Sequence, residues 1–345
     1  MPAEWEPHES TWLTWPVNKT TWPGGLLKEA ESIYLRMIAE LLTGEKVNLL
    51  VPNKKTARLV LKRLGSGKIN APKLVFHEVK TVDTWIRDYG PIFIKRRKVA
   101  GERRKGISFT KWNFNAWGGK YSDLARDNRV VDRIAALKDT RRFDTGIVLE
   151  GGSIDVNGRG TCITTEQCLL SPSRNPHLSK KGIEGFLRRF LGIRKVVWLK
   201  EGIEGDDTDG HVDDITRFVN PTTVLTAAES DPRDRNHALL KENLEILRSE
   251  CDQDGKRFRI LELPMPGKVG AGRSDSEGER LPASYANFYI GNKVVLVPLY
   301  SHKNDKPALK IIREAFPGRK TVGIECTALV YGLGSIHCVT QQEPK

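Results

Sequence analysis

Cys338 lies near the end of the chain, and its spacing from the other cysteines fits neither a disulfide framework nor a zinc finger. Residues that could act with this thiol are spread far upstream: Asp88, Glu150, His211 and Asp213. An ionised thiol is a nucleophile, an imidazole transfers protons near neutral pH, and carboxylates bind cationic groups. One thiol, one imidazole and three carboxylates therefore indicate covalent chemistry on a cationic carbon.

The residues around Cys338 help to decide between two interpretations of its thiol. A single cysteine in an apolar stretch is more often a small buried hydrophobe than a nucleophile. Residues 332–335, with two glycines and a serine, would let a substrate come close to the backbone, and polar residues 340–342 follow. We therefore favour a nucleophile at Cys338 and interpret Cys162 and Cys168 as core residues.

His211 and Asp213 lie in the densest acidic stretch, residues 204–214, which has six acidic residues and no Lys or Arg. A calcium loop is excluded, because it would place Gly205 and Thr216 at its first and last ligand positions. A solvated acidic turn and a set of aspartates facing a cationic substrate remain. Because His211 and Asp213 alternate, we expect both side chains on one face of an extended strand, which favours the second.

A zinc site built from His211, Asp213 and Cys338 is chemically possible, but no second histidine stands at ligand spacing. We therefore expect no metal. A protein with a formal net charge of +13 would repel a cation, so an acidic pocket would be needed to select a cationic substrate.

Composition places the chain among soluble globular proteins. It has 345 residues, of which 39% are hydrophobic and 29% charged, enough for a large core in one domain or two. Residues 1–8 lack the basic and apolar regions of a signal peptide, and no apolar run approaches the ~20 residues of a membrane span. Five cysteines without a CxxC pair suit a reducing compartment, so we expect a cytoplasmic protein.

The positive net charge leaves a non-enzymatic alternative, a basic module that binds nucleic acid. The basic residues are scattered, however, in short clusters at 95–98, 103–105 and 188–189, without an aromatic RNA-binding motif or a helix-turn-helix beside them. We interpret these clusters as solvated turns and helix faces, and we expect no nucleic-acid partner.

A repeated local pattern organises the chain. Four hairpins are indicated by apolar segments on either side of a turn, and the turns recur at intervals of roughly 60 to 70 residues, which suits a repeated α/β module. The hairpin segments are 91–94 with the Lys/Arg-rich turn after it, 153–158 with 161–164, 215–221 with 223–225, and 287–292 with 294–297. Helix-periodic segments at 27–42, 179–191, 236–249 and 307–315 each precede a short apolar strand, at 47–51, 195–199, 259–263 and 321–324.

The candidate residues fall in register with this repeat. Asp88, Glu150 and the His211–Asp213 pair each come just before a hairpin, and Asn287 heads the fourth. Cys338 would occupy a final short strand that pairs with residues 11–15 and closes a ring. Modules arranged radially would bring these equivalent positions to one centre.

Six motifs in one order resemble the agmatine deiminase and bacterial-type peptidylarginine deiminase family, from the first residues to the last. They are PAEWEPHE at 2–9, WIRDYGP at 85–91, EGG at 150–152, GDDTDGHVD at 205–213, PASYANFY at 282–289 and IHCVTQQ at 336–342. The resemblance implies one domain over residues 1–345. Its fold would be a five-module α/β propeller of the pentein type, with pseudo-fivefold symmetry around a central active site.

The resemblance also implies a role for each matching residue. Cys338 would be the nucleophile and His211 the general acid and base, while Asp88 and Asp213 would bind the guanidinium nitrogens. Glu150 would assist orientation at the same centre.

Two more implied residues lie further out: Trp85 would line the pocket, and Asp207 would face the distal amine of agmatine. The implied reaction converts agmatine to N-carbamoylputrescine and ammonia through a covalent thiouronium, on the route to putrescine, without a cofactor. Peptidyl-arginine deimination is the close alternative, and a homodimer is implied as well. The family usually reads GGGNIHC where residues 332–338 read GLGSIHC, so Leu333 and Ser335 affect substrate preference more than reaction type.

Overall fold

Short sheets of one repeated topology position the candidate residues. The computed structural model describes residues 1–65, 71–95, 106–138, 140–270 and 279–345. In this part of the chain the strands form five sheets, and in each an antiparallel pair is followed by a strand parallel to the second of the pair. Four of the sheets have three strands each. The first two consist of β4 (Ile92–Lys95), β5 (Ile107–Asn113) and β6 (Arg142–Val148), and of β7 (Asp155–Val156), β8 (Thr161–Thr165) and β9 (Lys195–Leu199). The next two consist of β10 (Thr216–Asn220), β11 (Thr223–Ala228) and β12 (Arg259–Pro264), and of β13 (Tyr289–Ile290), β14 (Val294–Leu299) and β15 (Lys320–Glu325).

The fifth sheet joins the two ends of the chain. Its order is β16 (Thr340–Pro344), β1 (His8–Thr14), β2 (Lys46–Val51) and β3 (Leu74–Glu78). β16 and β1 run antiparallel with Trp12 opposite Gln341, so the predicted pairing of residues 11–15 with the C-terminal segment is confirmed. The predicted place of Cys338 within that strand is wrong, because β16 begins two residues later, at Thr340.

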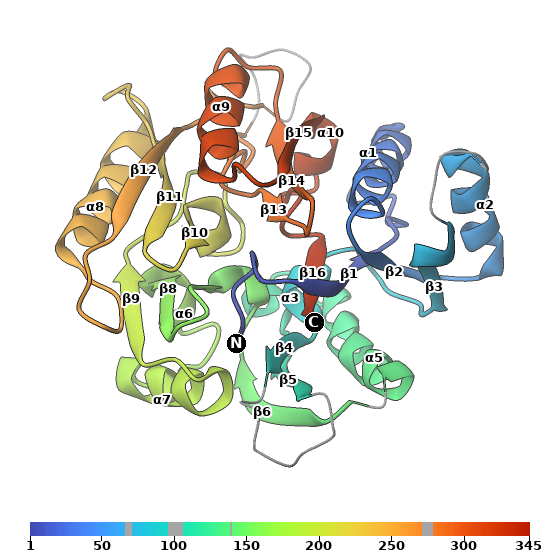
Figure 1. Cartoon of the computed structure of the whole chain (residues 1–345), viewed down its shortest axis with the longest axis horizontal. Coiled ribbons are helices and arrows are strands. Elements are labelled where there is room, and N and C mark those ends of the chain that lie inside the picture. Colours follow the sequence, from blue (N-terminus) through green and yellow to red (C-terminus); the bar gives the residue numbers. More distant parts are fainter. Residues whose placement is uncertain (66–70, 96–105, 139, 271–278) are drawn as a thin grey trace.

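The long helices lie around the outside, whereas β1 and β16 lie near the middle of the view (Figure 1). They are α1 (Leu26–Leu41), α2 (Lys54–Leu64), α5 (Val130–Lys138), α7 (Lys180–Leu191), α8 (Arg235–Ser249) and α9 (Asp305–Ala315). Single-turn elements are α3 (Ile86–Tyr89), α4 (Ala116–Gly119), α6 (Glu166–Leu169), α10 (Thr327–Val330), η1 (Ala71–Lys73), η3 (Gly151–Ser153) and η4 (Val212–Asp214), and η2 (Leu124–Arg129) is slightly longer. None of the helices within the described ranges is both long and apolar enough to cross a bilayer.

Helix α7 illustrates how the sequence sets these elements. The Ser179 hydroxyl accepts a hydrogen bond from the Gly182 amide and caps the first turn, and Gly192 ends the helix in the left-handed conformation. Between these ends Ile183, Leu187 and Leu191 recur at four-residue spacing and are buried. The prediction of a helix over 179–191 is therefore confirmed, with the first residue acting as the cap.

Central strands such as β11 and β14 are buried at nearly every position, as expected for strands covered on both faces. Rigid strands of this kind leave the chemistry to the connections between them. The candidate residues do lie in connections. Each lies shortly before the first strand of a sheet: Asp88 before β4, Glu150 before β7, Asp213 before β10, Asn287 before β13 and Cys338 before β16.

The local backbone at His211 and Asp213 differs from the prediction. Instead of an extended strand, residues 212–214 form the 3₁₀ turn η4. Asp206 is the physical reason, because one of its carboxylate oxygens accepts the amide hydrogens of both Gly210 and His211 and so closes the loop into a compact turn. The basic residues at 96–98 and 103–105 lie outside the described residues.

Candidate active site

Three of the candidate side chains converge on the backbone of Gly152. A side-chain carbon on Gly152 would lie 2.6 Å from His211 Nδ1, 2.9 Å from Asp213 Oδ2 and 3.0 Å from Asp88 Oδ1. These distances are shorter than carbon contacts allow, so only glycine permits this approach. The EGG motif therefore contributes a gap in which two carboxylates and an imidazole meet.

Cys338 is 7% exposed and lines a cavity of about 290 Å³ together with Asp88. The Asn287 amide donates a hydrogen bond to Cys338 Sγ at 3.2 Å and another to Asp214 at 2.9 Å. Burial raises the pKa of the Cys338 thiol well above its usual value, and the neighbouring charges of Asp213, Asp214 and Asp88 raise it further. Without a cation beside it, this thiol stays protonated.

Asp88 is held on both carboxylate oxygens. The indole N–H of Trp117 donates to Oδ2 at 2.9 Å, and the amide of Gly152 donates to Oδ1 at 3.0 Å. Burial raises the Asp88 pKa to about 6, although nearby His211 partly offsets the shift. Trp117 itself has a φ of 53°, a left-handed backbone that is costly for a bulky residue.

His211 is 1% exposed, and its Nδ1 lies 3.8 Å from Asp88 Oδ1. Burial alone would lower its pKa, but the charge of Asp88 and the neighbouring Cys168 raise the pKa well above the usual range. The imidazole can therefore carry a proton at neutral pH, as a general acid must.

Asp213 and Glu150 are fully buried, and each makes one strong charged contact. Asp213 Oδ2 lies 2.6 Å from His337 Nδ1, and Glu150 Oε1 accepts from Arg174 Nε at 2.8 Å. Burial opposes ionisation of Asp213, yet the hydrogen bond and charge of His337 hold its pKa below the usual range. Both carboxylates thus have one oxygen occupied by the protein.

Their second oxygens have no partner. Within the described residues, Glu150 Oε2, Asp213 Oδ1 and His211 Nε2 are buried and make no hydrogen bond. Buried polar atoms are nearly always paired, because an unmet hydrogen bond costs about 1–3 kcal/mol. The two unpaired carboxylate oxygens, Glu150 Oε2 and Asp213 Oδ1, therefore indicate a place for hydrogen-bond donors from a substrate.

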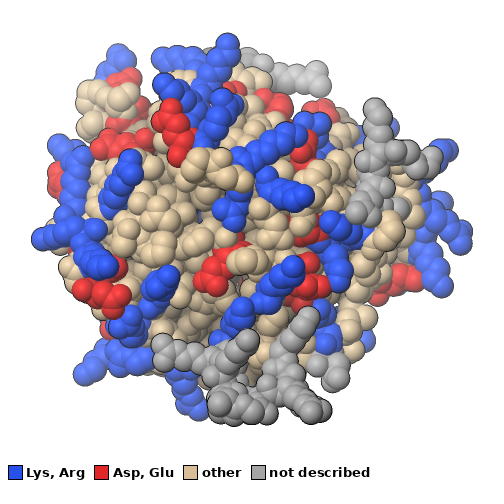
Figure 2. Space-filling view, viewed as in Figure 1, with Lys and Arg blue, Asp and Glu red and all other residues tan. Residues whose placement is uncertain are grey.

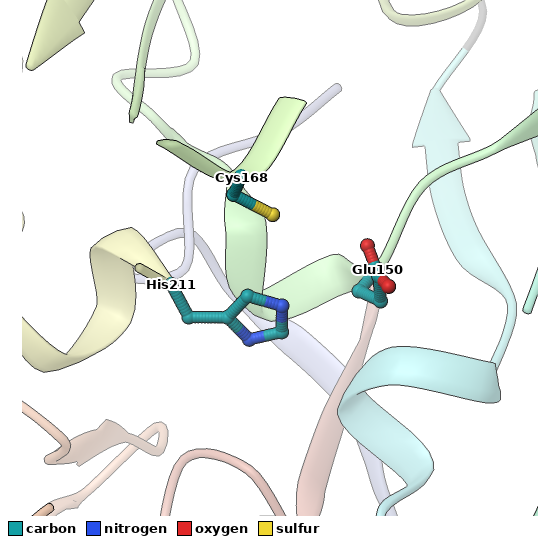
Figure 3. A group of neighbouring side chains, drawn as sticks. All are labelled: Glu150, Cys168 and His211. Carbon is teal, nitrogen blue, oxygen red and sulfur yellow. The ribbon is translucent and has the colours of Figure 1, made fainter. Parts of the chain in front are cut away.

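Figure 3 shows that Glu150, Cys168 and His211 face one another. One ligand atom from each lies within 4.8 Å of the others, and a nitrogen, a thiolate and a carboxylate could together hold a cation such as Zn²⁺. Arg174, bound to Glu150, places a positive charge at the same cluster and opposes a second cation. Burial also raises the Cys168 pKa, which opposes the thiolate that a metal needs.

Trp85 and Asp207 both line the cavity. Trp85 is 5% exposed and packs against Trp22, with the two ring centroids 5.7 Å apart. Asp207 lies at the solvent side, where the Tyr121 hydroxyl donates to it at 2.6 Å and Lys120 Nζ lies 3.4 Å away. The cavity therefore extends from a buried thiol to a half-exposed carboxylate.

Two residues of the acidic stretch have a structural use that the sequence does not reveal. Asp206 binds backbone amides, and Asp209 pairs with Arg174 at 2.6 Å and Lys120 at 2.8 Å. The prediction that the aspartates as a group face the substrate is therefore wrong for these two, which hold the loop closed.

Comparison with known proteins places this geometry in a family. Residues 1–344 match the Porphyromonas-type peptidyl-arginine deiminases. This chain belongs to that family. An agmatine deiminase of Medicago truncatula is 38% identical over 367 residues, covering 100% of this chain and 96% of that protein.

Solved structures of deiminases agree over the whole chain. The agmatine deiminase of Enterococcus faecalis superposes with a TM-score of 0.90 at 34% identity, covering 100% of this deiminase and 95% of that chain. The agmatine deiminase of C. jejuni gives a TM-score of 0.84 at 31% identity, with 100% and 95% covered.

Sequence reasoning missed several contacts of this deiminase. Trp117 donates to Asp88 from a strained turn, and nothing in its sequence neighbourhood indicates that role. Cys168 was interpreted as a core residue, and it is buried, but it lies beside His211. His337, next to Cys338 in the chain, contacts Asp213, with Nδ1 2.6 Å from Oδ2.

The two departures from the family pattern have different surroundings. Leu333 lines the cavity with a φ of 69°, the left-handed region that glycine occupies without cost. Ser335 is 1% exposed and receives a hydrogen bond from Tyr300 at 3.3 Å. Leu333 is therefore the departure placed to alter the shape of the cavity that Cys338 lines.

Proposed function

We propose that this chain is an agmatine deiminase, which hydrolyses the guanidinium of agmatine to N-carbamoylputrescine and ammonia. The observation that carries the proposal is the set of buried, unpaired acceptors beside a cavity-lining thiol. A guanidinium presents several N–H donors in one plane and a positive charge, which matches the two free carboxylate oxygens.

We also propose one domain over residues 1–345 with a five-module propeller of the pentein type. In support, each of the five sheets repeats one strand topology, and each is preceded by a site segment. A radial arrangement would bring these segments to one axis.

Asp88 and Asp213 bind the guanidinium and compensate its charge in the buried site. This binding holds the planar group against the thiol, and the cation favours the Cys338 thiolate that burial otherwise suppresses. Glu150, with Oε2 free, orients a second nitrogen or the attacking water.

The reaction then proceeds in two half-reactions. The Cys338 thiolate forms a bond to the guanidinium carbon, and the carbon–nitrogen bond breaks as His211 protonates the departing ammonia. Water, deprotonated by His211, adds to the resulting S-alkyl thiouronium, and the carbon–sulfur bond breaks. The products are the ureido compound and the regenerated thiolate.

Trp85 packs along the cavity wall, and Asp207 attracts the distal ammonium of agmatine at the solvent side. Lys120 and Tyr121 already contact Asp207 and partly compensate its charge. We therefore expect Asp207 to contribute to agmatine binding only as much as a surface ion pair does. The five cysteines are all free, which supports our proposal of a cytoplasmic location.

A nucleic-acid-binding role receives less support. On the face shown in Figure 2, Lys and Arg are dispersed among acidic and uncharged residues rather than gathered along one groove. Binding to a phosphate backbone needs a contiguous basic surface.

Steady-state turnover of four substrates tests the proposed function. We expect kcat/KM for agmatine to exceed that for free arginine and for a peptide ending in arginine by at least about 100-fold. Butylguanidine, which lacks the distal ammonium, should lose about three- to tenfold, since a half-exposed carboxylate gives ~1 kcal/mol. A preference for the peptide would replace agmatine with peptidyl-arginine as the substrate.

The pH dependence of kcat/KM for agmatine should follow the ionisation of the Asp88 carboxyl group. Its raised pKa of about 6 means that the free carboxyl is neutral below pH 6 and ionised above it. We therefore expect kcat/KM to fall about tenfold per pH unit below pH 6 and to level off above it. Asp127→Asn is the control, because burial also raises the pKa of Asp127 to about 6 outside the cavity lining. An acid limb that disappears in this variant would contradict the assignment.

A further inference from the structure

A cluster of buried charges lies next to the proposed catalytic residues. Six side chains, each at most 8% exposed, form three acidic and three basic members: Glu4, Asp155, Asp213, Arg87, Arg217 and His337. We call this set the charge cluster. Arg87 directly precedes Asp88 in the sequence, and His337 directly precedes Cys338. In both motifs one residue lines the cavity and its neighbour belongs to the charge cluster.

Glu4, from the N-terminal segment, contacts all three basic members of the charge cluster. Its Oε1 accepts from Arg217 at 2.9 Å and from the Ile290 amide at 2.9 Å. Its Oε2 accepts from Arg87 at 3.2 Å and lies 2.8 Å from His337 Nε2. Burial opposes ionisation of Glu4, but Arg217 and His337 hold its pKa well below the usual range.

His337 joins Glu4 to Asp213. Nε2 lies 2.8 Å from Glu4 Oε2, and Nδ1 lies 2.6 Å from Asp213 Oδ2. Each ring nitrogen of His337 therefore faces a carboxylate oxygen, and the ring bridges the two acids. Asp213 Oδ2 is thereby occupied, and Oδ1 is the oxygen left without a partner.

We propose that Glu4 and His337 are positioning residues, which hold Asp213 so that Oδ1 faces the guanidinium of the substrate. This role rests on the proposed function, because it assumes that Asp213 binds a guanidinium. A carboxylate turns about its Cβ–Cγ bond, and one fixed oxygen determines where the other points. Glu4 fixes the ring of His337, and His337 fixes Asp213, so the N-terminal segment determines how tightly substrate is held.

A purely structural role for the same contacts makes a different prediction. A buried ion pair that only stabilises the fold would change the free energy of unfolding when broken, without changing substrate affinity in the protein that remains folded. A positioning role changes affinity in the folded protein. It also makes the effect of Glu4 depend on His337, because Glu4 reaches Asp213 only through the ring.

A double-mutant cycle separates these roles. Glu4→Gln, His337→Gln and the double variant are compared with the parent for KM and kcat on agmatine at pH 8. Each single variant should raise KM roughly tenfold, the loss expected for one charged hydrogen bond, and lower kcat less. The double variant should be no worse than His337→Gln alone, whereas multiplied effects would show independent action and overturn the proposal.

Asp155→Asn is the matched control. Asp155 accepts from Arg217 in the same charge cluster but has no contact with His337 or Asp213 among the described hydrogen bonds. It should lower the unfolding temperature and leave KM within twofold of the parent. If Glu4→Gln does not fold, Glu4→Asp keeps the charge, shortens the reach to His337, and should show the same rise in KM.

Measuring agmatine binding by calorimetry tests the positioning role independently of the proposed function. Measured in a Cys338→Ala background, the dissociation constant should rise roughly tenfold with Glu4→Gln or His337→Gln. An unchanged constant in folded variants would refute the positioning role even if the parent turns over agmatine. Absence of turnover in the parent would instead refute the proposed function.

Discussion

Replacing Cys338 with alanine should reduce formation of the ureido product by roughly 10⁴-fold or more, because the substitution removes the sulfur on which the thiouronium forms. Cys338 is the cysteine that lines the cavity, and Asn287 contacts its sulfur at 3.2 Å. Steady-state production of N-carbamoylputrescine, measured by a colour assay for ureido groups, checks this result. Circular dichroism and thermal unfolding should show a folded protein, since the substitution removes one sulfur atom.

Cys162→Ala is the matched control for this loss. Cys162 is equally buried, and burial raises its pKa, but it lies in β8 and does not line the cavity. This variant should keep kcat/KM within about twofold of the parent. Turnover by Cys338→Ala above about 1% of the parent rate would mean that the nucleophile is another group.

His211→Gln should lower kcat by about 10²- to 10⁴-fold, the usual contribution of a general acid and base. Glutamine keeps a similar volume but cannot deliver a proton to ammonia or take one from water. The charge of Asp88, 3.8 Å away, helps keep the imidazole protonated in the free protein, so the loss should appear in the first half-reaction as well as the second. Single-turnover quench experiments would follow both steps.

His177→Gln provides the comparison for His211→Gln, because His177 is exposed and does not line the cavity. It should be indistinguishable from the parent in kcat and KM. Retention of more than about a tenth of the parent kcat by His211→Gln would exclude this imidazole as the proton carrier.

The sequence indicates much of the fold because its elements are locally encoded. The period and caps of α7 predict its bounds, and the turns at Asn157–Gly158 and Gly291–Asn292 predict the β7–β8 and β13–β14 hairpins. The pairing of β1 with β16 also follows, because the repeat leaves the two ends of the chain as the missing neighbours.

The local geometry of the site could not be predicted in the same way. Whether residues 212–214 form a strand or a turn depends on the Asp206 carboxylate binding two backbone amides, a contact that periodicity does not encode. The hydrogen bond from Trp117 to Asp88 spans 29 residues, and the contact of Glu4 with His337 spans 333. Such contacts depend on how the sheets are arranged in space.

Mass spectrometry of the protein quenched with acid during agmatine turnover tests the central claim most directly. We predict an adduct equal to agmatine less ammonia on the peptide that contains Cys338, present with agmatine and absent from Cys338→Ala. An adduct on Cys168 or another cysteine, or full turnover without any adduct on Cys338, would contradict covalent deimination at this thiol.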